Sequence, residues 1–233
     1  ASAIAIVMSM AMFSGMILTP VYVQMIRGIS PFESGILMLP GAILMGLMSP
    51  IVGRLFDRYG AKAMAIIGLT STIVTTYYLS KLQVDSGYYY IMTLYTVRMM
   101  GMSLVMMPVM TNGLNELPMI SNPHGTAMNN TLQQVSGAIG TALLLTIMTN
   151  RTEATGLKLA TEAANSGGPI NEAEIEIQSM LDGVTFSFFI STLIAIIALI
   201  LAFFIKRVTP PSYTGFEDKG ELVKAEEVEV EKT

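Results

Sequence analysis

Cysteine is absent from the 233-residue chain, and histidine occurs once, as His124. Disulfides, thiolate metal sites and a cysteine nucleophile are therefore excluded, and a histidine metal site or catalytic triad would depend on His124 alone. Charged residues make up only 13 % of the chain, against roughly 25 % in soluble domains. So few charges do not favour a soluble enzyme or a disordered chain. With a net charge of −4 and no Lys/Arg tract, a nucleic-acid-binding surface has no basis either.

The few charges are also unevenly distributed, and 52 % of the residues are hydrophobic. A helix needs about 20 mostly apolar residues to cross a bilayer. Helices are the default in hydrocarbon because they satisfy their own backbone polar groups. We therefore predict an all-α membrane protein with six spanning helices, at about 2–25, 35–53, 63–80, 88–110, 127–149 and 184–205.

The connections between the predicted helices differ in character. Residues 54–62 form a short basic loop, and residues 150–183 form the longest connection, whose part 152–165 is compatible with an interfacial helical turn. The polar segment 206–233 has no core-forming run, which predicts a disordered tail. The chain is thus predicted to consist of a helix bundle, 1–205, and a tail, 206–233.

An even number of spans places both chain ends on one side of the membrane. Cytoplasmic flanks carry an excess of lysine and arginine. The side shared with the tail has Arg54, Arg58, Lys62, Lys206 and Arg207. The opposite side has Arg27, Lys81, Arg151 and Lys158. This small bias favours a cell-membrane protein with a cytoplasmic C-terminus.

One stretch, Gly35 to Lys62, reads GILMLPGAILMGLMSPIVGRLFDRYGAK. It resembles the second-half copy of the G-R-L-x-D-R-x-G loop signature of the major facilitator superfamily. The stretches Tyr22–Gly35 and His124–Leu143 are similar to the fourteen-span drug:proton antiporter branch, which contains the EmrB and QacA type multidrug exporters. The resemblance implies the carboxyl-terminal six-helix half of a bacterial exporter, with an N-terminal half as its partner.

Within that signature, Gly53 and Gly60 permit tight backbone geometry, and Arg54, Asp57 and Arg58 supply charges. The resemblance implies a conformational switch, in which the charges hold one helix pair against its neighbour in one transport state. The alternative is a plain basic loop with a local ion pair, worth about 0–1 kcal/mol when exposed.

Arg98 is the one charged residue inside a predicted span. A charge at that depth costs at least ~2.5–3.5 kcal/mol, so it is expected to face the bundle interior. The spacing from Arg98 to Gly101 looks like an echo of the family's fourth-helix arginine motif, which leaves a role in transport and structural bracing both open. No Asp or Glu lies within the six spans. If protons drive transport, their carboxylate carrier is therefore expected outside this chain.

Polar side chains on otherwise apolar helices, with one methionine from the Met-rich fourth span, are the candidates for a substrate cavity. They are Tyr22, Gln24, Met106, Asn112, Asn129, Asn130, Gln133 and Gln134. Methionine-rich surfaces adapt to varied apolar ligands, although ordinary core filling explains methionine equally well. Candidate hinges in the second span are Pro40, Gly41 and Pro50.

Together these features predict a non-enzymatic, proton-coupled exporter of amphipathic compounds that works by alternating access between two bundles. Its expected partners are the lipid bilayer, protons, small amphipathic substrates and its N-terminal half, with no cofactor and no metal. Two alternatives remain at this point: an exporter of a metabolite, lipid or siderophore on the same fold, and a helix bundle that does not transport.

Overall fold

The computed structural model describes residues 2–114, 122–166 and 171–204, and the predicted tail 206–233 lies outside them. The described elements are all helical, which confirms the all-α prediction. They are α1 (Ser2–Val21), the π-helical turn η1 (Tyr22–Ile26), α2 (Pro31–Leu79), α3 (Tyr88–Leu114), α4 (Asn122–Ser166) and α5 (Glu172–Ala202).

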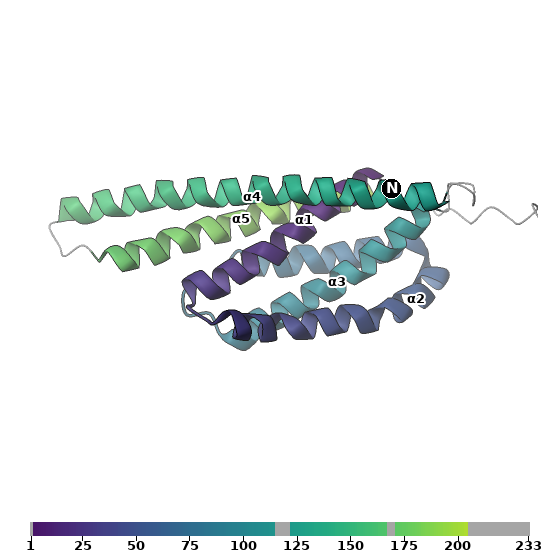
Figure 1. The fold of residues 1–233 in the computed structure, drawn as a ribbon, viewed down its shortest axis with the longest axis horizontal. Helices are drawn as coiled ribbons and strands as arrows, with labels where there is room; N and C mark the ends of the chain where they lie inside the picture. The colour runs from purple at the N-terminus through teal and green to yellow at the C-terminus, as the bar shows by residue number, and fades with distance from the viewer. Residues whose placement is uncertain (1, 115–121, 167–170, 205–233) are drawn as a thin grey trace, which may run out of the picture.

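Five of these helices are long and apolar enough to cross a membrane, a number that does not by itself confirm the predicted six. The predicted spans 35–53 and 63–80 both fall within α2. The backbone of α2 leaves the helical region at Gly60, with φ 77° and ψ 168°. Figure 1 shows that α2 turns back on itself there, so that its two parts lie side by side.

The predicted loop 54–62 is wrong, because α2 stays helical up to Tyr59 and resumes at Ala61. Leu55 and Phe56 pack against a buried cluster of Val52, Met64 and Leu104, which stabilises the helical conformation on both sides of the reversal. At the other end, α2 starts at a capping box in which the Ser30 side chain accepts a hydrogen bond from the Glu33 backbone N–H at 3.3 Å.

The predicted connection 150–183 is also wrong, since most of it is helix. Helix α4 continues to Ser166, and α5 already begins at Glu172. Helix α4 has 45 residues. At 1.5 Å per residue it extends about 67 Å, far more than the ~30 Å of a hydrocarbon core. Figure 1 shows the two helices running past the others as a projecting hairpin. Residues 150–166 continue the helix because they hold alanine, leucine, glutamate and lysine and no proline.

Glycines bring the helices close together. A Cβ on Gly140 would lie 2.6 Å from the Cα of Met10, and one on Gly137 would lie 2.5 Å from the Phe13 ring, so α1 packs tightly on α4. Gly68 of α2 meets the carbonyl oxygen of Gly101 of α3 in the same way, at 2.4 Å from an added Cβ. These contacts join α1 closely to α4, and α2 closely to α3.

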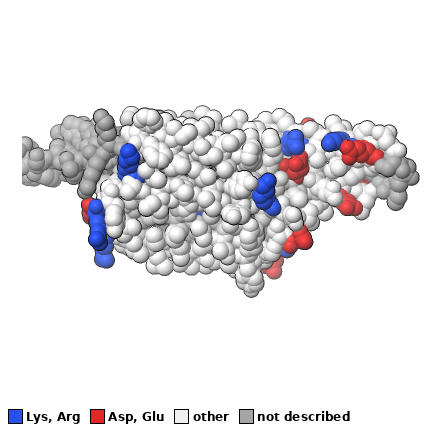
Figure 2. All heavy atoms as spheres, turned by 180° about the vertical axis from the view of Figure 1, so that it is seen from behind, with Lys and Arg blue, Asp and Glu red and all other residues white. Residues whose placement is uncertain are grey.

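Charged side chains gather toward the two ends of the molecule, with a nearly uncharged band between them (Figure 2). We call the end with the reversal of α2 the Gly60 end. The opposite end, formed by residues 26–31, residues 80–87 and the projecting part of α4 and α5, is called the hairpin end. Large apolar side chains such as Leu47, Ile67 and Ile197 are exposed in the band, as expected for contact with lipid.

Candidate functional site

Arg98 of α3 is completely buried, with 0 % of its surface exposed. Its Nη2 donates a hydrogen bond to the backbone oxygen of Ala11 in α1 at 2.7 Å, and its Nε donates to Thr76 Oγ1 in α2 at 3.1 Å. One guanidinium therefore connects three helices, and hydrogen bonds from a charged donor are stronger than neutral ones.

Gly15 of α1 makes room for this guanidinium. A Cβ at position 15 would lie 1.5 Å from Arg98 Nη1, so no larger residue fits while Arg98 keeps its position. Sequence reasoning singled out Arg98 but missed Gly15, because a glycine in an apolar helix carries no signal of what it faces. The pair shows that the charge is enclosed by protein rather than exposed to lipid.

The charged residues of the signature motif, Arg54, Asp57 and Arg58, are exposed on the last turns before the reversal of α2. Their spacing of three and four residues places them on one side of the helix. The Arg58 guanidinium also lies 5.4 Å from the centroid of the Tyr59 ring. Gly53 is half-buried next to α3, where an added Cβ would make an ordinary contact of 3.8 Å with Met107.

Two of the cavity candidates lie at the hairpin end. Tyr22 is fully buried in η1, and its hydroxyl donates to the backbone oxygen of Gln83 at 2.5 Å. The Gln24 Nε2 donates to Ser34 Oγ at 3.3 Å. Both side chains thus tie η1 to neighbouring segments.

The other cavity candidates lie toward the Gly60 end, on α3 and α4. Met106 and Gln133 line a void of about 10 Å³ among α1, α3 and α4, which is room for one water molecule at most. Asn129 is half-buried, whereas Asn130 and Gln134 are exposed on α4. The last candidate, Asn112, is buried near the end of α3. The described residues therefore do not gather the candidates around one cavity.

The hinge candidates Pro40, Gly41 and Pro50 all lie within the first part of α2, where the backbone is helical throughout. Gly41 is buried against α3, with an added Cβ at 3.0 Å from the Tyr95 ring. Pro40 is half-buried and Pro50 is exposed. In this structure the sharp change of direction in α2 occurs at Gly60 instead.

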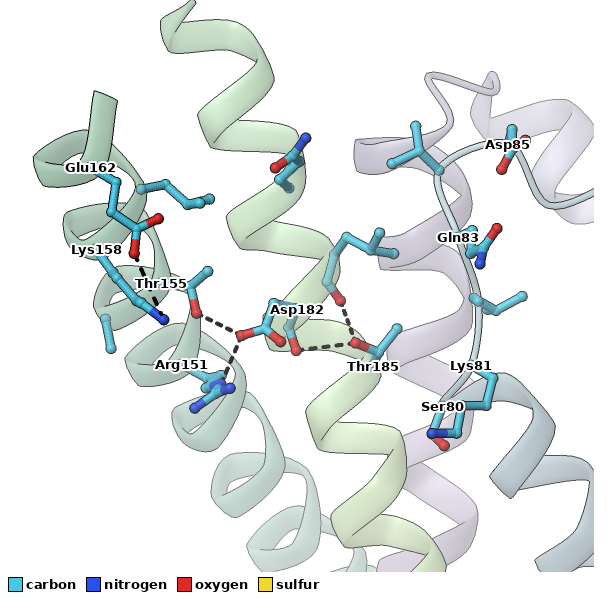
Figure 3. Close-up of a pocket in the computed structure, with 16 residues that line it drawn as sticks. Ser80, Lys81, Gln83, Asp85, Arg151, Thr155, Lys158, Glu162, Asp182 and Thr185 are labelled. Carbon is cyan, nitrogen blue, oxygen red and sulfur yellow. Dashed lines mark hydrogen bonds and ion pairs between the residues drawn. The ribbon is translucent and has the colours of Figure 1, made fainter. Parts of the chain in front are cut away.

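A groove of about 950 Å³ at the hairpin end was missed by sequence reasoning. It lies between residues 80–85, α4 and α5, and Figure 3 shows Arg151 and Thr155 of α4 pointing toward Asp182 of α5. Arg151 Nε donates to Asp182 Oδ2 at 2.7 Å, and Thr155 Oγ1 donates to the same oxygen at 2.6 Å. From sequence, 150–183 is predicted to be one connection and not two paired helices. That prediction gives no reason to expect Arg151 and Asp182 to face each other.

No cluster of three or more histidine or acidic side chains suited to a metal ion occurs in the part of the chain that the structure describes. His124, on the first turn of α4, is exposed. Long apolar helices, charges restricted to the two ends and one enclosed arginine define a multi-pass helical membrane protein.

Comparison with known proteins gives the family. The family model described as Major Facilitator Superfamily matches residues 1–141, and the chain belongs to this superfamily of transporters, not to an enzyme family. It is 54 % identical over 151 residues to the MFS-type transporter YhcA of Bacillus subtilis. The aligned region covers 65 % of the chain and 28 % of YhcA.

Several relatives have names that refer to drug resistance, including the following two. The lincomycin resistance protein LmrB of Listeria monocytogenes is 42 % identical over 198 residues, covering 85 % of the chain and 40 % of LmrB. A multidrug resistance protein B homolog of Mycobacterium tuberculosis is 31 % identical over 173 residues, covering 70 % of the chain and 31 % of the relative. The chain therefore spans well under half the length of these relatives.

Proposed function

We propose that the chain is the carboxyl-terminal six-span half of a proton-coupled exporter that moves amphipathic drug-like compounds out of a bacterial cell. The observation that supports this most directly is the 42 % identity to a lincomycin resistance protein over 85 % of the chain. In this proposal Gly60 divides α2 into two spans, and the N-terminal half comes from the remainder of a longer transporter.

The proposed orientation places the Gly60 end and the C-terminus in the cytoplasm. The basic residues Arg54, Arg58 and Lys62 at the Gly60 end support this, by the excess of positive charge on cytoplasmic flanks. These 233 residues contain no cysteine, so a single introduced cysteine is the only thiol among them, and the unsubstituted protein serves as the labelling control. In whole cells, an impermeant maleimide should label Thr161→Cys in the hairpin and spare Tyr59→Cys; the reverse pattern would overturn the orientation.

We assign the described polar groups two roles in transport. Arg98 braces α1, α2 and α3, since both of its hydrogen-bond acceptors lie on other helices. The charges at the reversal of α2 act in the conformational switch. The proton-carrying carboxylate lies outside this chain, and alternating access occurs between the two halves.

The test of function is export by the intact protein. Expression in a drug-sensitive bacterial strain should raise resistance to lincomycin or to cationic dyes, and a protonophore should abolish efflux from energised cells. Resistance that persists without a proton gradient would contradict proton coupling. No change for any compound tested, with the protein present in the membrane, would favour a different cargo.

The switch is tested by Asp57→Asn, with Glu153→Gln in the hairpin as the matched control for removing one exposed acidic charge. We expect Asp57→Asn to lower efflux at least tenfold at unchanged membrane expression, and the control to leave efflux intact. Equal efflux in both variants would reduce the motif to an ordinary basic turn.

A further inference from the structure

The groove at the hairpin end combines charged walls with a partly apolar lining. Its charged residues are Lys81, Arg151, Lys158, Asp85, Glu162 and Asp182. Leu82, Leu159 and Leu181 add apolar surface between them. Three cations and three carboxylates give the groove no net charge, although both signs of charge are present. Such a surface complements a ligand group that carries both signs.

The cations of the groove differ in how they are already engaged. Arg151 pairs with Asp182 at 2.7 Å, and Lys158 lies 3.9 Å from Glu162. Lys81 has no carboxylate within ion-pair distance among the residues that the structure describes, and its Nζ lies 5.7 Å from the centroid of the Tyr77 ring. Lys81 is therefore the cation available to an anionic group, such as a phosphate.

One face of α5 leads from the groove into the apolar band. Gln178, Asp182 and Thr185 line the groove, and the same face continues through Phe189 and Leu193, which are exposed. The spacing of three or four residues keeps these positions in one line along the helix. The face thus changes from polar to apolar within about two turns.

The second part of α2 forms a matching wall. From Lys81 backward, Tyr77, Val74 and Ile67 are exposed at the same helical spacing. The buried sides of α2 and α5 meet in shared clusters, Leu79 with Phe188 in one of them. The groove therefore lies at the end of the seam between α2 and α5, and both exposed faces run from it into the region that contacts lipid.

We propose that this groove binds the headgroup of a zwitterionic phospholipid of the phosphatidylethanolamine type, with its acyl chains along the seam between α2 and α5. The phosphate is held by Lys81, and the primary ammonium group donates hydrogen bonds to Asp85, the groove carboxylate that takes part in neither of the two ion pairs described above. A phosphatidylcholine headgroup cannot donate these bonds, and an anionic headgroup lacks the positive group that this carboxylate requires. The proposal depends on the chain spanning a membrane and not on which compound is exported.

The experiment measures which lipids stay bound to the intact protein. The protein is purified in detergent with equal amounts of phosphatidylethanolamine, phosphatidylcholine and phosphatidylglycerol, and bound lipid is counted by native mass spectrometry. We expect phosphatidylethanolamine to be retained about tenfold over the other two, as charge-assisted hydrogen bonds favour it. Equal retention of all three lipids would overturn the proposal.

Lys81→Gln tests the headgroup contact, and Lys62→Gln at the Gly60 end is the matched control for removing one exposed lysine. We expect Lys81→Gln to lower phosphatidylethanolamine retention about tenfold and Lys62→Gln to leave it unchanged. Equal losses in the two variants would overturn the site. Both lysines are exposed, so both variants should fold, and unchanged elution volume and thermal stability verify this.

A second arm separates a lipid from a free phosphate compound. Excess glycerophosphoethanolamine, which has the headgroup but no acyl chains, should not displace the bound lipid, and neither should inorganic phosphate. Displacement by either compound would show that the apolar faces contribute nothing and would overturn the lipid assignment. Export assays on Lys81→Gln are independent of this result, so failure of the lipid site and failure of the transport function remain distinguishable.

Discussion

The backbone of Gly60 offers the sharpest test of the fold. Its φ of 77° and ψ of 168° lie in a region that residues with a Cβ almost never occupy. The reversal of α2 depends on this conformation, because the helix is continuous up to Tyr59 and again from Ala61. Replacing Gly60 by alanine should therefore strain the only non-helical residue in this helix.

The expected loss of stability in Gly60→Ala follows from the backbone torsion angles of Gly60. Residues held in such regions cost about 1–3 kcal/mol each. For a chain of this size, that lowers the melting temperature by roughly 2–4 °C per kcal/mol. Gly60→Asn should give no relief, because asparagine tolerates the left-handed helical region at ψ of about 30–60°, far from the ψ of 168° found here.

The matched control is Gly46→Ala in the same helix. Gly46 is exposed and helical, and an added Cβ would have no neighbour within 4 Å. Alanine should stabilise that position by about 0.5–1 kcal/mol relative to glycine. Thermal unfolding of the detergent-solubilised protein measures both variants. If Gly60→Ala melts at the same temperature as Gly46→Ala, or if Gly60→Asn behaves like the wild type, the backbone argument is wrong.

Three further predictions concern helix packing. Gly15→Ala should break one of the hydrogen bonds of Arg98 and lower the free energy of unfolding by about 1.5–3 kcal/mol. Adding Arg98→Met should recover much of this loss in a double-mutant cycle. If the effects of the two substitutions simply add, the contact between Gly15 and Arg98 is contradicted. Gly140→Ala should lower thermal stability by about 1–3 kcal/mol, because its Cβ would meet the backbone of Met10, and an unchanged melting curve would show that α1 can shift. Asp182→Asn should cost no more than about 1 kcal/mol, since the paired side chains of Arg151 and Asp182 are 47 % and 37 % exposed; a loss above 2 kcal/mol, measured by the same melts, would contradict a weak surface pair.

Hydrophobic runs predicted where the helices are, because lipid-spanning segments must be long and apolar. The predicted span 88–110 starts where α3 (Tyr88–Leu114) starts and ends four residues before it. The predicted span 2–25 covers α1 and all but the last residue of η1, which together run from Ser2 to Ile26. The boundaries failed where charges were interpreted as loop signals. Residues 54–59 and 150–166 carry charges, yet lysine, arginine and glutamate are good helix formers, and a helix can continue into water beyond the bilayer.

The sites were less predictable than the helices for a physical reason. The partners of Arg98 are a backbone carbonyl and a threonine hydroxyl, 87 and 22 residues away, and neither has a sequence signature. The groove likewise depends on Lys81 lying next to α4 and α5, which only the packing of the helices decides. The sequence identifies Arg98 as an isolated charge but does not identify the groups that surround it.

The contacts of α1 bear on how the bundle moves. On one side α1 is bound to α2 and α3 through the buried hydrogen bonds of Arg98, and on the other side Met10 lies against Gly140 of α4. Helix α5 joins the same unit, because Gly183 packs against Thr152 of α4. Movement of one helix relative to the others would break hydrogen bonds from a buried charge, or open interfaces that are packed at glycine. Movement of the whole bundle as one body would break neither, which is compatible with the rocking between two halves that we propose.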